Sequence, residues 1–212
     1  MIGLVGRYHP VKDHENFLRA AALLLRSHPD VQFVLCGEKV NWINPALCRL
    51  IDELKLAERV HLLDQRQDMA RITAALDIAT SSSCAESFPN VIGEAMSCGV
   101  PCVVTDVSDL AWIVGETGRI VPPRNARALA DGMRDLVEMG PEGRAILGKS
   151  ARERVIKHFP LKEIESLYEA LYEDIINQPD RGRTSVVRYH EFSEISDANS
   201  QGSDRRLRLG SE

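Results

Sequence analysis

The sequence predicts an α/β domain in which helices cover both faces of a doubly wound, parallel β-sheet. Three observations support this fold class. Short apolar runs alternate with amphipathic segments over most of the chain, a pattern typical of buried strands separated by helices. The connecting segments are long enough to hold helices, so successive strands pair in parallel through right-handed crossovers. Gly99 and Pro101 stand where one such helix must end, because glycine suits the left-handed closing residue and proline prevents continuation.

The individual elements follow from the same pattern. The predicted strands are apolar runs at residues 2–5, 31–36, 59–63, 77–80, 102–105 and 119–121. The first predicted helix, residues 14–27, has an apolar stripe made by Phe17, Ala20, Ala21, Leu24 and Leu25. Further helices are predicted at residues 45–56, 69–76, about 89–98, 126–139, 141–158 and 161–177. The last three form a helical C-terminal cap.

Two domains of unequal character are predicted. Residues 1–178 carry the alternating pattern and form the folded domain. From residue 179 to residue 212 large apolar side chains are sparse, and Ser, Asp and Arg mix freely. A segment of that composition buries too little apolar surface to fold, so we predict a polar, disordered tail.

Composition excludes several functions. The chain has 212 residues, a formal charge of −5 and a pI near 5.7, which argues against nonspecific nucleic-acid binding. Its five cysteines form no CxxC pair, as expected of reduced thiols in a cytoplasmic protein. The longest apolar run, residues 20–25, is too short to span a bilayer. Peripheral membrane association through a partner remains open.

The most informative segment places two carboxylates around the start of a helix. Glu86 precedes the predicted helix and Glu94 lies about one turn inside it, with Pro89 expected in the first helical turn. Free backbone N–H groups and the helix dipole there suit a diphosphate. Glu94 leans back toward the helix N-terminus, where it can accept hydrogen bonds from a ribose. Gly93 is expected to let the helix approach the sheet closely. Spacing alone leaves a second explanation open, because acids near a helix N-terminus also favour the dipole.

A basic pair follows the first predicted strand. Arg7 offers a planar guanidinium and Lys12 a compact ammonium, a combination that suits a pyrophosphate leaving group. A cation held there stabilises the negative charge that develops on a phosphate group as the bond to it breaks. Two solvated bases beside a turn are the alternative.

Other phosphate or metal motifs are missing from the sequence. The loop after residue 6 lacks the P-loop pattern GxxxxGK[ST], and residues 3–6 do not match GxGxxG. A kinase-like or dinucleotide-binding function is therefore disfavoured. No DxD or His/Asp cluster indicates a metal, so no metal or other cofactor is expected.

The segment from Glu86 to Pro101 closely resembles the signature of retaining GT-B glycosyltransferases of the glycosyl transferases group 1, or GT4-like, family. That signature is a Glu, seven residues, a second Glu, Ala-Met or Ala-Leu, a small residue and Gly-x-Pro, and Gly6-Arg7 with Lys12 resembles the family's diphosphate grip. The resemblance runs from Gly3 to about Asn177. It implies a Rossmann-like C-terminal domain that binds a nucleotide-diphosphate sugar.

The resemblance also implies residue roles. Arg7 and Lys12 would stabilise the departing diphosphate, Glu86 would hold the donor sugar, and Glu94 would hold the ribose. Arg7, Lys12 and Glu86 are therefore the predicted catalytic residues. The predicted substrate-binding residues are Arg7, Lys12, Glu86, Ser87, Phe88, Pro89, Asn90, Val91 and Glu94.

Two nearby segments stay open. The family usually has glycine after the third strand, where this chain has Asp64, so Asp64 and Arg66 are either base contacts or solvated loop residues. Residues 81–84, Ser-Ser-Ser-Cys, either line the cleft or form a turn of small residues.

The predicted function is sugar transfer from a nucleotide-diphosphate donor to a hydroxyl acceptor, with retention at the anomeric carbon and without metal. Such enzymes carry a preceding domain that supplies the acceptor site, and this chain begins at the first strand of the second domain. We therefore expect an N-terminal domain or subunit as partner and little turnover by the chain alone. The alternatives are a non-catalytic nucleotide-sugar-binding module or gene remnant, and a GT-B-type nucleotide-sugar epimerase.

Overall fold

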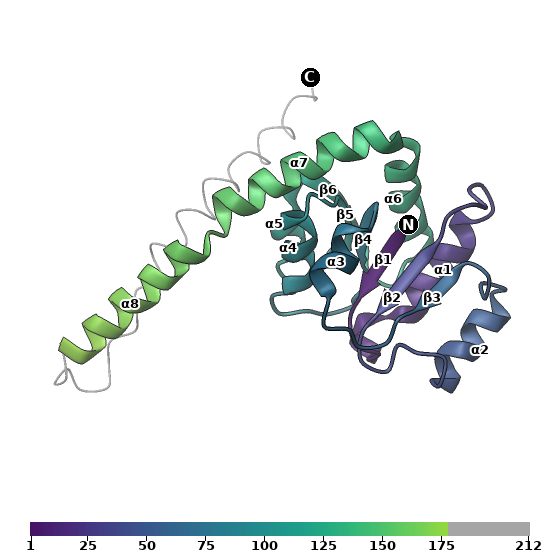
Figure 1. The fold of residues 1–212 in the computed structure, drawn as a ribbon, viewed down its shortest axis with the longest axis horizontal. Coiled ribbons are helices and arrows are strands. Elements are labelled where there is room, and N and C mark those ends of the chain that lie inside the picture. Colours follow the sequence, from purple (N-terminus) through teal and green to yellow (C-terminus); the bar gives the residue numbers. More distant parts are fainter. Residues whose placement is uncertain (178–212) are drawn as a thin grey trace, which may run out of the picture. The chain divides into compact units, whose positions relative to one another are not determined.

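The computed structural model describes residues 1–177 and contains, within them, a six-stranded parallel sheet (Figure 1). Its strands lie in the spatial order β3-β2-β1-β4-β5-β6, and every pairing is parallel. Their bounds are β1 (Ile2–Val5), β2 (Phe33–Cys36), β3 (Val60–Leu62), β4 (Ile78–Ser81), β5 (Cys102–Thr105) and β6 (Gly118–Val121). The predicted fold class is confirmed.

The strand order reverses between β1 and β4. From β1 the chain builds outward through β2 to β3, and it then returns to place β4 on the other side of β1. In open parallel sheets, such a reversal leaves a crevice beyond the carboxyl ends of the two strands, where ligands bind. The loops that follow Val5 and Ser81 both open onto this crevice.

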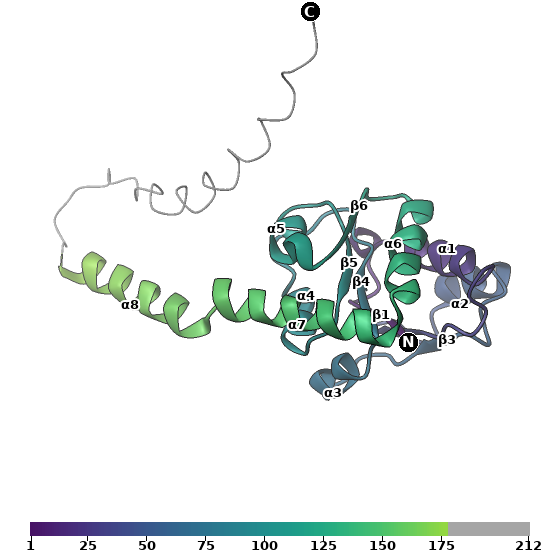
Figure 2. The same ribbon diagram turned by 90° about the horizontal axis from the view of Figure 1, so that it is seen from above.

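Helices cover both faces of the sheet (Figures 1 and 2). The helices of the first unit are α1 (His14–Leu24), α2 (Pro45–Glu53), α3 (Met69–Ala74), α4 (Asn90–Ser97), α5 (Leu110–Val114), α6 (Ala126–Glu138) and α7 (Gly140–His158), with 3-10 turns η1 (Pro10–Lys12) and η2 (Gly115–Thr117). Helices α1, α2 and α6 contribute to one buried cluster. Helices α4, α5 and α7 contribute to the other.

The two clusters arise because side chains alternate along each strand. Ile2 and Leu4 point into the cluster beneath α1 and α6. Gly3 faces the opposite side, where an added Cβ would lie 2.3 Å from a methyl carbon of Leu76. In β5, Val103 belongs to the first cluster, while its neighbours on either side belong to the second. Strands buried on both faces account for the continuous apolar runs in the sequence.

The end of α4 packs against α7 through two glycines. Gly99 has a φ of +73°, which confirms the predicted left-handed closing residue. A Cβ on Gly148 would stand 1.8 Å from the carbonyl oxygen of Gly99. The sequence therefore allows the two backbones to touch, and this contact fixes where α4 ends relative to the sheet.

Two predictions near α4 are wrong. Pro89 does not lie in the first helical turn: it is the N-cap of α4, in an extended conformation with φ −79° and ψ 97°, and the helix begins at Asn90. Gly93 does not bring α4 close to the sheet, since a Cβ there would have no neighbouring atom within 4 Å. The helices η1, α5 and η2 were not predicted, because each is at most five residues long and shows no period.

The chain divides into two compact units, and the first, Met1–Leu161, contains the sheet. Helix α8 (Leu161–Asn177) confirms the predicted helix at residues 161–177. The aromatic rings of Tyr168 and Tyr172 lie 6.2 Å apart on α8. The predicted tail, residues 179–212, lies outside the described residues.

Candidate functional site

The candidate site lies at the carboxyl ends of β1 and β4. The loop after β1 turns beside β2, where the N–H of Gly6 donates to the carbonyl of Cys36 at 2.8 Å. Gly37 has a φ of +154°, and a Cβ there would stand 2.2 Å from the carbonyl oxygen of Gly6. Glycine at residue 37 therefore permits the close approach that sets the path of the loop carrying Arg7.

The structure brings Lys12 and Glu86 together although they are far apart in the sequence. Nζ of Lys12 lies 2.5 Å from Oε1 of Glu86. The Glu86 side chain is only 10% exposed and that of Lys12 23%. A carboxylate so enclosed requires a charged or hydrogen-bonding partner, and the ammonium supplies it. Two residues predicted to contact different parts of one ligand are thus direct neighbours.

Serines join the loops that carry this ion pair. Oγ of Ser82 donates to the carbonyl of Lys12 at 2.7 Å, and the N–H of Cys84 donates to the carbonyl of Val11 at 2.8 Å. Oγ of Ser83 donates to Oε1 of Glu86 at 2.6 Å. The segment 81–84, whose role the sequence left open, therefore lies at the site and connects the loop that carries Lys12 to the loop that carries Glu86.

The loop from Glu86 to α4 presents free backbone donors. Pro89 provides no side-chain cap for α4, and the N–H of Ile92 turns back to the carbonyl of Pro89 at 3.2 Å. Within residues 1–177, no acceptor is paired with the backbone N–H groups of Ser87, Phe88, Asn90 and Val91. Unpaired N–H groups at the start of a helix favour an anion.

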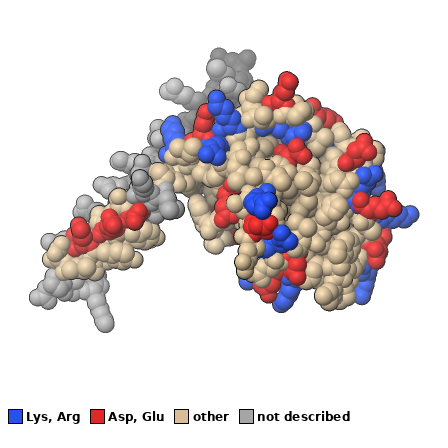
Figure 3. Space-filling view, viewed as in Figure 1, with Lys and Arg blue, Asp and Glu red and all other residues tan. Residues whose placement is uncertain are grey.

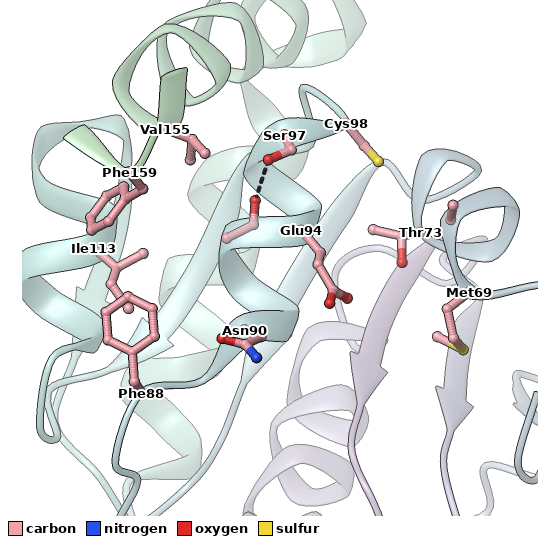
Figure 4. A pocket seen from close by; sticks show the side chains of 12 residues that line it. Met69, Thr73, Phe88, Asn90, Glu94, Ser97, Cys98, Ile113, Val155 and Phe159 are labelled. Carbon is pink, nitrogen blue, oxygen red and sulfur yellow. Dashed lines mark hydrogen bonds between the residues drawn. The ribbon is translucent and has the colours of Figure 1, made fainter. Parts of the chain in front are cut away.

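Glu94 lies in a different setting from Glu86. Its side chain is exposed and lines an open groove of about 690 Å³ that runs from α3 across α4 to α5 and the end of α7. Figure 4 shows the Glu94 carboxylate pointing toward the N-terminal end of α4, where Asn90 lies. It is on the side of the helix that faces Met69 and Thr73. The predicted lean toward the helix N-terminus is therefore observed. Gly93 lines the same groove.

The other side of α4 is apolar. Figure 4 shows Phe88, Ile113, Val155 and Phe159 gathered there, away from the Glu94 carboxylate. The rings of Phe88 and Phe159 are 6.1 Å apart, and the ring of Trp112 lies 4.9 Å from that of Phe159. The contact between Phe88 and Phe159 connects the loop from Glu86 to α4 with the residue that follows α7, and it supports the position of that loop.

Arg7, in the loop after β1, is exposed and forms no ion pair with any residue of the described part. It follows Gly6 in the same loop that carries Lys12. The structure places both predicted cations in the loop after β1. Their joint contact with a ligand stays a prediction.

Asp64 adopts the conformation that glycine favours. Its φ is +55°, so it occupies a left-handed position that costs a non-glycine residue free energy. Its carboxylate accepts from Nδ2 of Asn41 at 2.9 Å, which offsets part of that cost. Arg66 pairs with Asp68 through two hydrogen bonds of 2.9 and 3.0 Å. Asp64 thus has its partner in the loop between β2 and α2, and Arg66 has its partner within its own loop.

His14, which the sequence analysis did not single out, is buried behind the Lys12 loop. It is 3% exposed, and its ring lies 5.3 Å from that of Tyr8. Neither ring nitrogen has a well-aligned hydrogen-bond partner, although the backbone of Gly6 lies close enough to favour the charged form slightly. Burial dominates and lowers the pKa of His14 to about 4, and Lys12 lowers it further. Its position as the first residue of an amphipathic helix was the available signal.

Charges elsewhere are mixed. Figure 3 shows Lys and Arg interspersed with Asp and Glu on the face drawn there, without a broad basic area. Among residues 1–177, no group of three or more His, Cys, Asp or Glu side chains is arranged to hold a metal ion. None of the described helices is both long and apolar enough to cross a membrane. All five cysteines are free thiols, and burial raises the pKa of Cys102 to about 12.

Solved structures define the class of the fold. Sucrose-phosphate synthase from Thermosynechococcus elongatus superposes with a TM-score of 0.75 at 29% identity, over 83% of this chain and 45% of that one. Anabaena HepE, solved in complex with UDP, gives 0.72 at 26% identity over 81% and 48%. The C-terminal domain of a group 1 glycosyl transferase from Francisella tularensis gives 0.65 at 21% identity, over 76% of this chain and 86% of that domain. The fold is that of GT-B glycosyltransferases.

The family follows from sequence comparison. Residues 1–139 match the family model described as glycosyl transferases group 1, and the chain belongs to that family. It is 28% identical over 184 residues to N-acetyl-alpha-D-glucosaminyl L-malate synthase of Bacillus anthracis. It is 36% identical over 155 residues to D-inositol 3-phosphate glycosyltransferase of Mycobacterium leprae. These matches cover 84% and 69% of this chain but only 46% and 35% of the relatives, so the chain spans less than half of their length.

Proposed function

We propose that this chain binds a nucleotide-diphosphate sugar and forms the donor-binding half of a retaining glycosyltransferase that needs no metal. The observation that carries the proposal is the ion pair between Lys12 and Glu86, which lies beyond the carboxyl ends of β1 and β4. Family membership supports sugar transfer as the reaction class. The HepE complexes with UDP and UDP-glucose support the ligand class.

In the proposed mechanism, the protein acts mainly on the leaving group. The diphosphate lies against the free N–H groups of the loop before α4, and Arg7 and Lys12 approach it from the loop after β1. Negative charge grows on the diphosphate as its bond to the anomeric carbon breaks, so cations held in place stabilise the transition state more than the ground state. No metal is needed for this neutralisation.

The two acids orient the ends of the donor. Glu86 accepts hydrogen bonds from hydroxyls of the transferred sugar, and Glu94 accepts them from the ribose. Ser87, Phe88, Pro89, Asn90 and Val91 form the intervening loop. We expect the acceptor hydroxyl to enter from a preceding N-terminal domain, since the chain spans under half the length of its relatives. The location of the whole enzyme in the cytoplasm belongs to the same proposal.

A binding panel tests this assignment. Calorimetry with UDP, GDP, ADP and their glucose or mannose conjugates should reveal one preferred nucleotide. Arg7→Ala and Glu94→Ala should each weaken its binding by about 1.5–3 kcal/mol, the loss of one charge-assisted contact. The matched controls Arg26→Ala and Glu53→Ala replace exposed residues just after α1 and at the last position of α2. Equal affinities for all four variants would remove Arg7 and Glu94 from the site.

Turnover is tested separately with labelled donors and analysis of the products. The proposal expects little transfer by this chain alone and retention in any product formed with an added N-terminal half. Robust turnover by the purified chain would contradict the need for a partner. Conversion of the donor into its epimer would instead support the epimerase alternative.

A further inference from the structure

Oε1 of Glu86 already has two donors from the protein. Nζ of Lys12 approaches it at 2.5 Å, and Oγ of Ser83 donates to it at 2.6 Å. No residue in the described part of the chain donates to the second oxygen, Oε2. The two oxygens of a single carboxylate therefore have different surroundings, and only Oε2 is left for further hydrogen bonds.

Ser83 is itself held rigidly. It is 1% exposed, and its carbonyl accepts from Oγ1 of Thr105 at 2.6 Å. Oγ of Ser81 donates to Oγ of Ser83 at 3.3 Å. Thr105 is fully buried at the carboxyl end of β5, so the backbone of Ser83 is anchored to the sheet.

The backbone of Glu86 is held from the same strand end. Ser108, which follows β5 and has a φ of +47°, donates its hydroxyl to the carbonyl of Glu86. The main chain of Glu86 is thus bonded directly to a residue after β5, whereas its carboxylate is connected to β5 only through Ser83, whose carbonyl accepts from Thr105. This support is independent of Lys12, which comes from the loop after β1.

We propose that Ser83 is a positioning residue for donor-sugar recognition: it holds Oε1 of Glu86 together with Lys12, so that Oε2 alone meets the hydroxyls of the sugar. The inference rests on the proposed function. Because a carboxylate oxygen accepts up to two hydrogen bonds, Oε2 is suited to a pair of adjacent hydroxyls. Lys12 in turn connects the sugar end of the ligand to its diphosphate.

A matched set of ligands separates this role from a general structural one. UDP and UDP-glucose, GDP and GDP-mannose, and ADP and ADP-glucose are titrated calorimetrically into the 212-residue chain and its Ser83→Ala variant. The pair that wild type binds most tightly is used. We expect Ser83→Ala to keep its affinity for the nucleoside diphosphate within about twofold and to lose about tenfold for the nucleotide sugar. Ser150→Ala, on the exposed side of α7, should change neither.

A double-mutant cycle with Glu86→Gln completes the test. If Ser83 acts through Glu86, Ser83→Ala should add less than about twofold to the loss caused by Glu86→Gln. Additive losses, an unchanged preference for the sugar in Ser83→Ala, or equal losses for both ligands would each overturn the inference. Ser83→Cys keeps the side-chain volume with a weaker donor and should show the same selective loss if Ser83→Ala fails to fold. Wild type that binds none of these ligands would instead overturn the proposed function.

Discussion

Glu86 and Glu94 are the same residue type, eight positions apart, yet the protein treats them in opposite ways. Glu86 is 10% exposed and is held by Lys12 and Ser83. Glu94 is exposed in the groove beside α4 and is held by no residue in the described part of the chain. The difference indicates that the end of the site proposed to hold the sugar is built into the fold, whereas the end proposed to hold the nucleoside is open.

Breaking the enclosed ion pair should have the largest effect on stability. Lys12→Met keeps the aliphatic stem but leaves the Glu86 carboxylate without its charged partner. We expect the free energy of unfolding to fall by about 2–3 kcal/mol, less than for a fully buried pair because Lys12 is 23% exposed. Urea denaturation measures this loss.

Two further variants check the cause. Lys12→Met combined with Glu86→Gln should recover most of the lost stability, since no unpaired charge remains. Lys149→Met removes an exposed pair with Glu153 at 3.9 Å and should cost less than about 0.5 kcal/mol. A double variant no more stable than Lys12→Met would contradict the enclosed-charge explanation.

The stability of the protein should also depend on pH through the buried His14. Burial lowers the pKa of His14 from 6.5 to about 4, so between these pH values the unfolded chain binds a proton that the folded chain does not. This contribution is present above pH 6.5 and is lost as the pH falls toward 4. The free energy of unfolding should therefore fall by about 2 kcal/mol between pH 7 and pH 5 because of His14.

Comparison with His14→Gln isolates that contribution. The variant lacks the titrating ring, so its free energy of unfolding should fall by about 2 kcal/mol less than that of wild type between pH 7 and pH 5. Chemical denaturation at both pH values measures the difference. Parallel pH profiles for the two proteins would show that the buried ring does not titrate as expected.

The side of α4 that faces the groove should accept a larger side chain at residue 93, with a gain in stability. Gly93→Ala places a methyl group where no atom lies within 4 Å. Alanine also has a higher helix propensity than glycine, so the substitution favours the helical backbone of α4. We expect the free energy of unfolding to rise by up to about 1 kcal/mol. Gly140 is equally uncrowded but has a φ of +71°, so Gly140→Ala should lower stability by about 1 kcal/mol. A loss in Gly93→Ala would mean that this side of α4 is more tightly packed than the structure indicates.

The smallest effect on stability is expected at Glu94. Glu94→Gln removes a charge that no described residue pairs with, so the free energy of unfolding should change by less than about 0.5 kcal/mol. Its effect should appear in nucleotide affinity instead. A large loss of stability in Glu94→Gln would abolish the contrast with Glu86.

The fold was predictable because its signals are local and repeated. Apolar runs located every strand, and Gly99 with Pro101 located the end of α4. Strand bounds shifted by one or two residues, as between the predicted 31–36 and the observed Phe33–Cys36. Helix α5 escaped prediction because five residues give too little period to recognise.

The site was predictable only in part. The resemblance placed Lys12 and Glu86 in one site, but it gave no reason to expect their direct contact, because side-chain pairing depends on how two loops pack. The sequence left open whether Ser83, within residues 81–84, lines the cleft, and it did not single out Thr105 or Ser108. Only the packing of β5 beside β4 makes these residues supports for Glu86. Gly93 was misassigned because sequence does not tell which side of a helix faces a groove.

The central position of β1 has a consequence for how the protein acquires its shape. Ile2 pairs with Phe33 on one side and with Ile78 on the other. On the ribosome, β1 is made well before β4, and one edge of it has no partner until β4 emerges. Contacts that close such long stretches form slowly, and exposed strand edges invite association between chains. The crevice at the carboxyl ends of β1 and β4 can therefore form only after the residues of β4 have been made.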